Sequence, residues 1–92
     1  MRRVEGSATQ KAAVATPDAG LPNWIPLELR IGSRCAEFMW MYRQNGYEHY
    51  KHIDTRRYLI LDSRGTCFRR EGGDFVSADF GDEFERVIAG GR

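Results

Sequence analysis

The dipeptide Asn45-Gly46 lies between two stretches rich in aromatic residues, and it is the clearest local structural signal in the chain. A type I′ turn needs a positive φ at both central residues, and Asn and Gly adopt that conformation at the lowest steric cost. The dipeptide therefore predicts a two-residue β-hairpin, with arms over residues 36–43 and 47–53.

The turn type also predicts how the two arms pair. With two loop residues, Tyr42 should face His49, Trp40 should face Lys51, and the opposite charges of Arg43 and Glu48 should add roughly 0.2–1 kcal/mol. Strand side chains alternate between faces, which gives each face of the hairpin a predicted set of residues. One face is expected to hold Phe38, Trp40, Tyr42, Tyr47, His49 and Lys51, and the other Met39, Met41, Arg43, Glu48, Tyr50 and His52.

The remaining elements are predicted from apolar periodicity and turn residues. Residues 21–26 should form an extended connector, because Pro22 and Pro26 disfavour a helix, and the alternation over 27–31 predicts a strand. Further strands are expected over residues 57–61, 66–70 and 75–77, with turns at 62–65 and 71–74.

A C-terminal helix is predicted after Asp79, a good N-cap residue, and before the glycines at 90–91. Apolar side chains recur at helical spacing in this segment, at Phe80, Phe84, Val87 and Ile88. The expected fold class is α+β: a twisted antiparallel meander of five or six strands with one helix packed on one face.

The chain of 92 residues is long enough for one small domain. Residues 1–20 contain no aromatic residue, so we expect a flexible N-terminal tail followed by a single α+β domain over 21–92. Two cysteines, Cys35 and Cys67, are too few for a disulfide scaffold, and no apolar run approaches the roughly 20 residues of a membrane span. These features predict a soluble cytoplasmic protein that does not associate with a membrane.

The formal net charge of +1 argues neither for nor against nucleic acid as a partner, but the charges are unevenly distributed. Residues 43–70 contain seven Lys or Arg and three acidic residues, whereas residues 71–85 contain six acidic residues and no base. The middle of the chain is therefore its basic part.

Two histidines, His49 and His52, are the side chains most able to carry chemistry. Residues three apart on a strand point to opposite faces, so the two imidazoles should not share a metal ion, and no metal or other cofactor is expected. A small ribonuclease would need two titrating groups on one side of a groove, and His49 has only Lys51 and Tyr42 beside it. The simpler interpretation is two partly exposed strand histidines.

The residues most suited to binding are the aromatic and basic side chains of the central strands. Tyrosine, tryptophan and methionine with arginines at the edge are typical of protein interfaces, and the same mixture can stack and neutralise single-stranded nucleic acid. We therefore expect a non-enzymatic interaction module that contacts a protein partner or a second copy of itself, as an accessory or inhibitory factor. The alternative is a single-stranded RNA or DNA binder, and a small ribonuclease comes third. The candidate binding residues are Trp40, Tyr42, Tyr47, His49, Tyr50, Lys51, Arg56, Arg57, Tyr58, Arg69 and Arg70.

Overall fold

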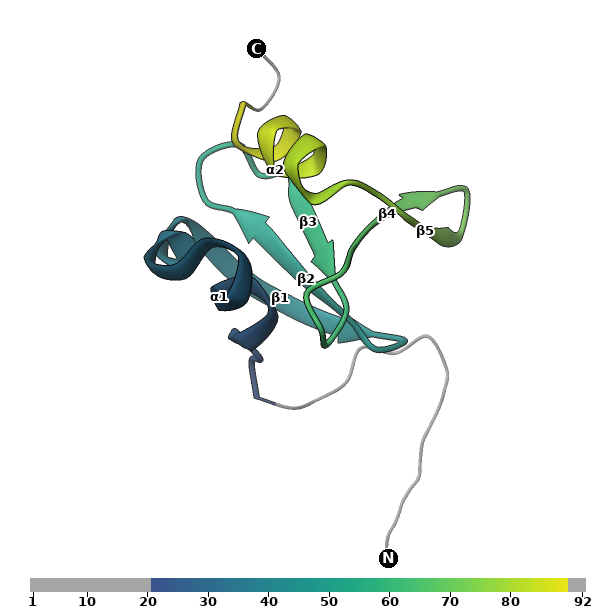
Figure 1. The fold of residues 1–92 in the computed structure, drawn as a ribbon, viewed down its shortest axis with the longest axis horizontal. Helices are drawn as coiled ribbons and strands as arrows, with labels where there is room; N and C mark the ends of the chain where they lie inside the picture. The colour runs from purple at the N-terminus through teal and green to yellow at the C-terminus, as the bar shows by residue number, and fades with distance from the viewer. Residues whose placement is uncertain (1–20, 90–92) are drawn as a thin grey trace, which may run out of the picture.

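The computed structural model describes residues 21–89 and shows a five-stranded antiparallel sheet in the order β1-β2-β3-β4-β5 (Figure 1). The α+β fold is thereby confirmed. The strands are β1 (Phe38–Gln44), β2 (Tyr47–His52), β3 (Tyr58–Leu61), β4 (Cys67–Glu71) and β5 (Asp74–Ser77). The helices are α1 (Ile25–Ile31), the 3-10 helix η1 (Gly32–Glu37) and α2 (Phe80–Ala89). The predicted tail over residues 1–20 and the glycines at 90–91 lie outside the described residues.

The central hairpin forms at the predicted dipeptide, with φ of 55° at Asn45 and 83° at Gly46. Near the turn the pairing is as predicted, and Tyr42 faces His49. Beyond Tyr42 the register shifts by one residue, so that Trp40 pairs with Tyr50 instead of Lys51. The predicted register is therefore correct only for the half of the hairpin next to the turn.

The irregularity lies at Met41, which acts as a β-bulge, and it changes which residues share a face. An extra residue in one strand reverses the alternation of every side chain beyond it. Phe38 and Trp40 consequently lie on the Tyr50 side of the sheet, and Tyr42 lies on the opposite side with His49. The two predicted sets of facing residues are wrong in this respect, because the prediction assumed an unbroken ladder.

The hydrophobic core lies on the Tyr50 side of the sheet, and both α1 and α2 contribute to it. Its buried members are Leu27, Phe38, Tyr50, Leu59, Leu61, Cys67 and Val87. Trp24, which precedes α1, packs against this cluster, with its ring centroid 5.6 Å from that of Tyr50. In Figure 1, α1 and α2 flank the strands at two separate positions. They cover one face and leave the Tyr42 side of the sheet to other contacts.

The strand and the connector predicted for residues 21–31 are wrong, because the segment forms α1 from Ile25 onward. Pro26 lies in the first turn of α1, where the missing N–H has no helical partner to lose. Leu27 is fully buried whereas Leu29 is 68% exposed. Five alternating residues were compatible with both a strand and a helix, and packing against the sheet selects the helix.

The later turns and the C-terminal helix follow the prediction. Gly65 has a φ of 87° and donates its N–H to the Asp62 carbonyl, which closes the turn between β3 and β4. Asp79 caps α2 by accepting the Asp82 N–H at Oδ2, 2.9 Å away. In the described part of the chain, no helix has both the length and the apolar character needed to span a bilayer.

Candidate functional site

A cleft opens where β3 and β4 separate. The two strands pair at only two positions, Ile60 with Phe68 and Leu61 with Cys67, and the rest of β4 continues with β5 as a projecting hairpin (Figure 1). The space beside the short ladder is closed on another side by α2, and its volume is about 540 Å³. This is within the range of roughly 300–1,000 Å³ that is usual for ligand pockets.

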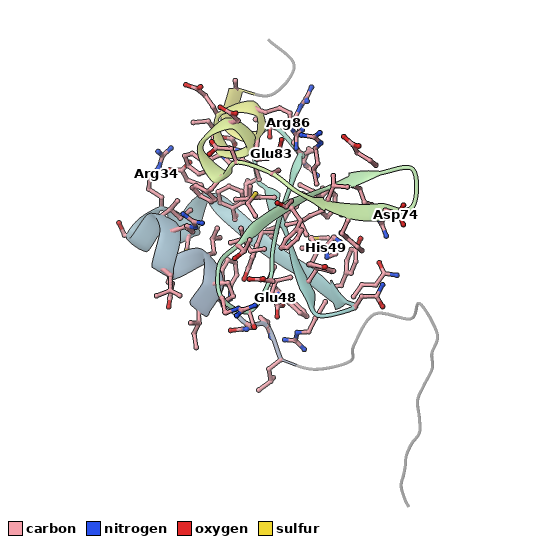
Figure 2. All side chains as sticks on the ribbon, turned by 45° about the vertical axis from the view of Figure 1, so that its right-hand side comes forward. Arg34, Glu48, His49, Asp74, Glu83 and Arg86 are labelled. Carbon is pink, nitrogen blue, oxygen red and sulfur yellow. The ribbon has the colours of Figure 1, made fainter. Side chains whose placement is uncertain are left out.

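The walls of the cleft are mainly basic and aromatic. Four of the lining side chains are arginines and one is acidic, so the cleft is a local concentration of positive charge on a nearly neutral protein. The lining residues are Tyr42, His49, Arg57, Tyr58, Ile60, Arg69, Arg70, Glu83 and Arg86. Figure 2 shows three of them, Glu83 and Arg86 on α2 and His49 on β2.

The aromatic wall consists of Tyr42, His49 and Tyr58. The Tyr42 and His49 rings are stacked, with centroids 4.2 Å apart and planes 19° from parallel. The Tyr58 ring lies 6.4 Å from each of these two rings, and the Lys51 ammonium lies 5.7 Å from the Tyr58 centroid. Because Tyr42 and Tyr58 are only half-buried, their rings can stack with a flat ligand.

The four arginines differ in how strongly their charges are already paired. Arg86 binds Glu83 at 2.9 Å, and Arg69 binds the exposed Glu71 at 2.6 Å. Arg70 donates to the Gln44 side chain at 3.1 Å and lies over the Phe75 ring, so its positive charge has no acidic partner in these contacts. The Arg57 guanidinium has neither a hydrogen bond nor an ion pair within residues 21–89. Arg57 and Arg70 are therefore the cations best able to receive an anion.

His49 is 2% exposed and is the buried polar residue of the cleft. Its Nδ1 lies 3.0 Å from the Tyr47 carbonyl oxygen, which can only accept, so Nδ1 carries the proton. Nε2 is buried and has no hydrogen-bond partner among the described residues. Burial lowers the pKa of His49 below its usual value, and the nearby charge of Arg70 lowers it further. The imidazole is therefore neutral, with an acceptor lone pair on Nε2.

We expect the protein to lose stability in mild acid because of His49. The unfolded chain takes up a proton at the ordinary histidine pKa of about 6.5, whereas the folded chain does so only at lower pH. The free energy of unfolding should therefore fall as the pH drops below about 6.5, until the folded-state pKa is passed. Urea titrations at several pH values measure this fall, which should be smaller in His49→Phe. An equal pH dependence in both proteins would contradict the assignment.

His52 is also buried, at 5% exposure, so the prediction of two partly exposed histidines is wrong. Its Nδ1 accepts the backbone N–H groups of Asp54 and Thr55, and its Nε2 lies 3.4 Å from a Glu37 carboxylate oxygen. His52 thus stabilises the turn after β2. It lies on the opposite side of β2 from His49, as expected, and the two cannot act on one substrate. Within residues 21–89 no group of His, Cys, Asp and Glu is suited to hold a metal ion.

Two of the predicted binding residues are placed in or beside the core instead. Tyr50 is fully buried and donates its hydroxyl hydrogen to the Asn23 carbonyl oxygen, 2.6 Å away. Trp40 is half-buried and donates its Nε1–H to Glu48. Both were expected on an open surface, and this expectation is wrong because the bulge places Trp40 on the Tyr50 side, beneath the helices.

Three others lie near the cleft without lining it. Tyr47 stacks on Phe75 with ring centroids 4.3 Å apart, next to His49 on the same face. Lys51 lies beside Tyr58, as described above. Arg56 is exposed in the turn between β2 and β3, with a φ of 66°. The predicted residues that do line the cleft are Tyr42, His49, Arg57, Tyr58, Arg69 and Arg70.

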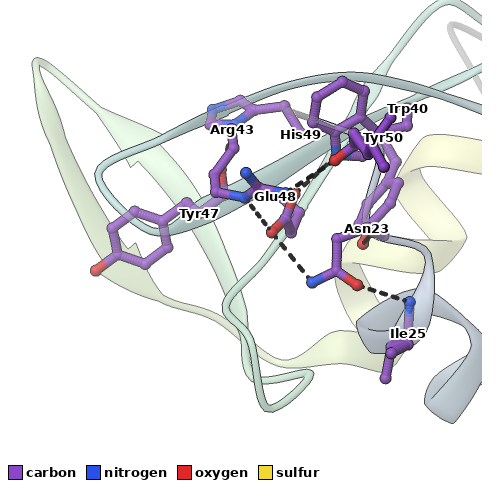
Figure 3. Close-up of polar contacts among 9 residues, drawn as sticks. Asn23, Ile25, Trp40, Arg43, Tyr47, Glu48, His49 and Tyr50 are labelled. Atoms are coloured by element: carbon purple, nitrogen blue, oxygen red, sulfur yellow. Dashed lines mark hydrogen bonds and ion pairs between the residues drawn. The ribbon is translucent and has the colours of Figure 1, made fainter. Parts of the chain in front are cut away.

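Glu48 has a structural role that the sequence did not reveal beyond its pairing with Arg43. Its carboxylate is 2% exposed and accepts hydrogen bonds from Trp40 Nε1 at 2.7 Å, Arg43 Nε at 2.7 Å and Asn23 Nδ2 at 3.3 Å (Figure 3). The Asn23 side chain also accepts the Ile25 N–H, at the start of α1. This Glu48 network therefore links the hairpin to the beginning of the first helix.

Comparisons of the chain with protein-family models, with curated proteins and with solved structures find no significant match. The functional argument therefore depends on the cleft itself.

Proposed function

We propose that this protein binds single-stranded nucleic acid in the cleft between β3, β4 and α2. The observation that carries the proposal is the meeting of four arginines with the Tyr42 and Tyr58 rings around one cavity of about 540 Å³. Phosphates would bind the arginines, above all Arg57 and Arg70, and a base would stack on a tyrosine ring. This combination of cations and flat rings is what single strands require.

The magnitudes favour a single strand over a duplex. Stacking of one unpaired base on an aromatic side chain contributes roughly 1–3 kcal/mol, and the bases of a duplex are not free to make this contact. A cleft of ligand-pocket size holds one nucleotide and not a double helix, while neighbouring phosphates reach the exposed Arg69 and Arg70 at the rim. We therefore expect binding without strong sequence preference.

Fluorescence anisotropy with labelled single-stranded oligonucleotides tests the proposal. For two to four phosphate contacts, the plot of log affinity against log salt concentration should have a slope of about −1.4 to −2.8. A duplex of the same sequence should bind more weakly, because its bases cannot stack. If no single strand binds at concentrations below about 100 μM in low salt, the proposal is wrong.

A protein partner is the second candidate, and it is favoured by the outer side of α1. Leu21, Ile25 and Leu29 are 85%, 61% and 68% exposed and follow one another at a spacing of four residues. Exposed apolar side chains at this spacing form a stripe that a partner can cover. Met39 and Met41, which were predicted to mark a protein-binding face, are each 37% exposed. Sedimentation velocity over a wide concentration range, on wild type and on Ile25→Glu/Leu29→Glu, tests self-association through this stripe.

A further inference from the structure

His49 is the one lining residue of the cleft that is both buried and incompletely hydrogen-bonded. It is 2% exposed, and its Nε2 has no partner within residues 21–89. The bond between Nδ1 and the Tyr47 carbonyl leaves Nε2 as a pure acceptor. Because an unsatisfied buried polar atom is unfavourable, a ligand group that donates a hydrogen bond to Nε2 gains more than an equivalent contact with an exposed atom.

We propose that the cleft prefers RNA to DNA, because the ribose 2′-hydroxyl donates a hydrogen bond to Nε2 of His49. This inference rests on the proposed function and adds the class of nucleic acid. The 2′-hydroxyl is the donor that RNA has and DNA lacks, whereas the amino groups of the bases are common to both.

The positions of the neighbouring groups suit a ribose at this point. Arg70 is near enough to His49 to influence its ionisation, so a phosphate on Arg70 brings the adjoining sugar towards the imidazole. The Tyr42 ring stacks on His49 at 4.2 Å and helps to screen it from solvent. Tyr42 directly follows the bulge at Met41, where the β1–β2 ladder is irregular. Movement of this ring opens Nε2 to the ligand, and the base can stack on the displaced tyrosine.

The test is a comparison of three single strands of one sequence, made of RNA, DNA and 2′-fluoro RNA, by fluorescence anisotropy. The 2′-fluoro strand keeps the sugar conformation of RNA but cannot donate from the 2′ position. Wild-type protein should bind RNA about tenfold more tightly than either of the others, as one net hydrogen bond predicts. In His49→Phe, which keeps a ring but has no acceptor, the ratio of RNA to DNA affinity should fall to about one.

The outcomes separate this inference from the proposed function. Equal binding of all three strands to wild-type protein would overturn the RNA preference and leave single-strand binding intact, whereas no binding of any strand would overturn both. If His49→Phe does not fold, the 2′-fluoro strand still tests the inference on the wild type. A nitrogen-15 NMR signal of His49 Nε2 that shifts with RNA and not with DNA would support direct contact, and a signal that moves equally with both would contradict it.

Discussion

Replacement of Glu48 by alanine is expected to lower the free energy of unfolding by about 3–5 kcal/mol. The Glu48 carboxylate is buried, and its removal leaves the Arg43 guanidinium and the Trp40 Nε1–H without their shared acceptor. Glu48→Gln should cost less, because an amide oxygen can still accept from one of these donors. Loss of the link to Asn23 should also loosen the start of α1. Because small domains are stable by only about 5–15 kcal/mol, the alanine variant should be close to unfolding.

Urea denaturation followed by circular dichroism measures this loss. Glu85→Ala is the matched control, because Glu85 is an exposed glutamate on α2 and its truncation should change stability by less than about 0.5 kcal/mol. If Glu48→Ala were no more destabilised than Glu85→Ala, the Glu48 network would not have the structural role assigned to it.

Removal of the two least neutralised cations of the cleft is expected to weaken single-strand binding by about 100-fold. Arg57→Ala/Arg70→Ala removes two charge-assisted phosphate contacts, each contributing roughly 1.5 kcal/mol or more. The salt dependence should become shallower by about 1.4 in the same plot, since each lost phosphate contact on a single strand removes about 0.7. Fold stability should change little, because neither guanidinium is part of the core.

The control for this prediction is Arg56→Ala/Arg64→Ala. Arg56 adjoins Arg57, Arg64 lies in the turn between β3 and β4, and both are exposed outside the cleft lining. The control therefore makes the same change in net charge at a different place, and it should weaken binding only a few-fold. Equal losses in both double variants would mean that binding follows overall charge and not the cleft.

The parts of the fold that the sequence predicted are those fixed by neighbouring residues. The turn at Asn45-Gly46 and the Asp79 cap depend on local backbone preferences, and both form as expected. The bulge at Met41 could not be predicted, because it places Phe38 and Trp40 on the side where the core and Glu48 lie. Segment 25–31 was misassigned for a similar reason, since its burial is decided by the sheet that it contacts.

The candidate site was only partly predictable. The aromatic and basic residues of β1 to β4 were selected by residue type, but the separation of β4 from β3, which brings Tyr58 and Arg70 to one cleft, is a tertiary feature. Arg86 was missed because it follows the acidic segment 71–85, where its ion pair with Glu83 was not anticipated. An arginine on α2 three residues after an acid was the available signal.

The most direct measurement of single-strand binding in the cleft is an NMR titration of nitrogen-15-labelled protein with a short single-stranded RNA. The largest shifts should fall on the backbone amides of Tyr42, His49, Tyr58 and Arg70, with little change at Leu29 on the outer side of α1. Shifts centred on α1, or no shifts at saturating RNA, would contradict binding in the cleft.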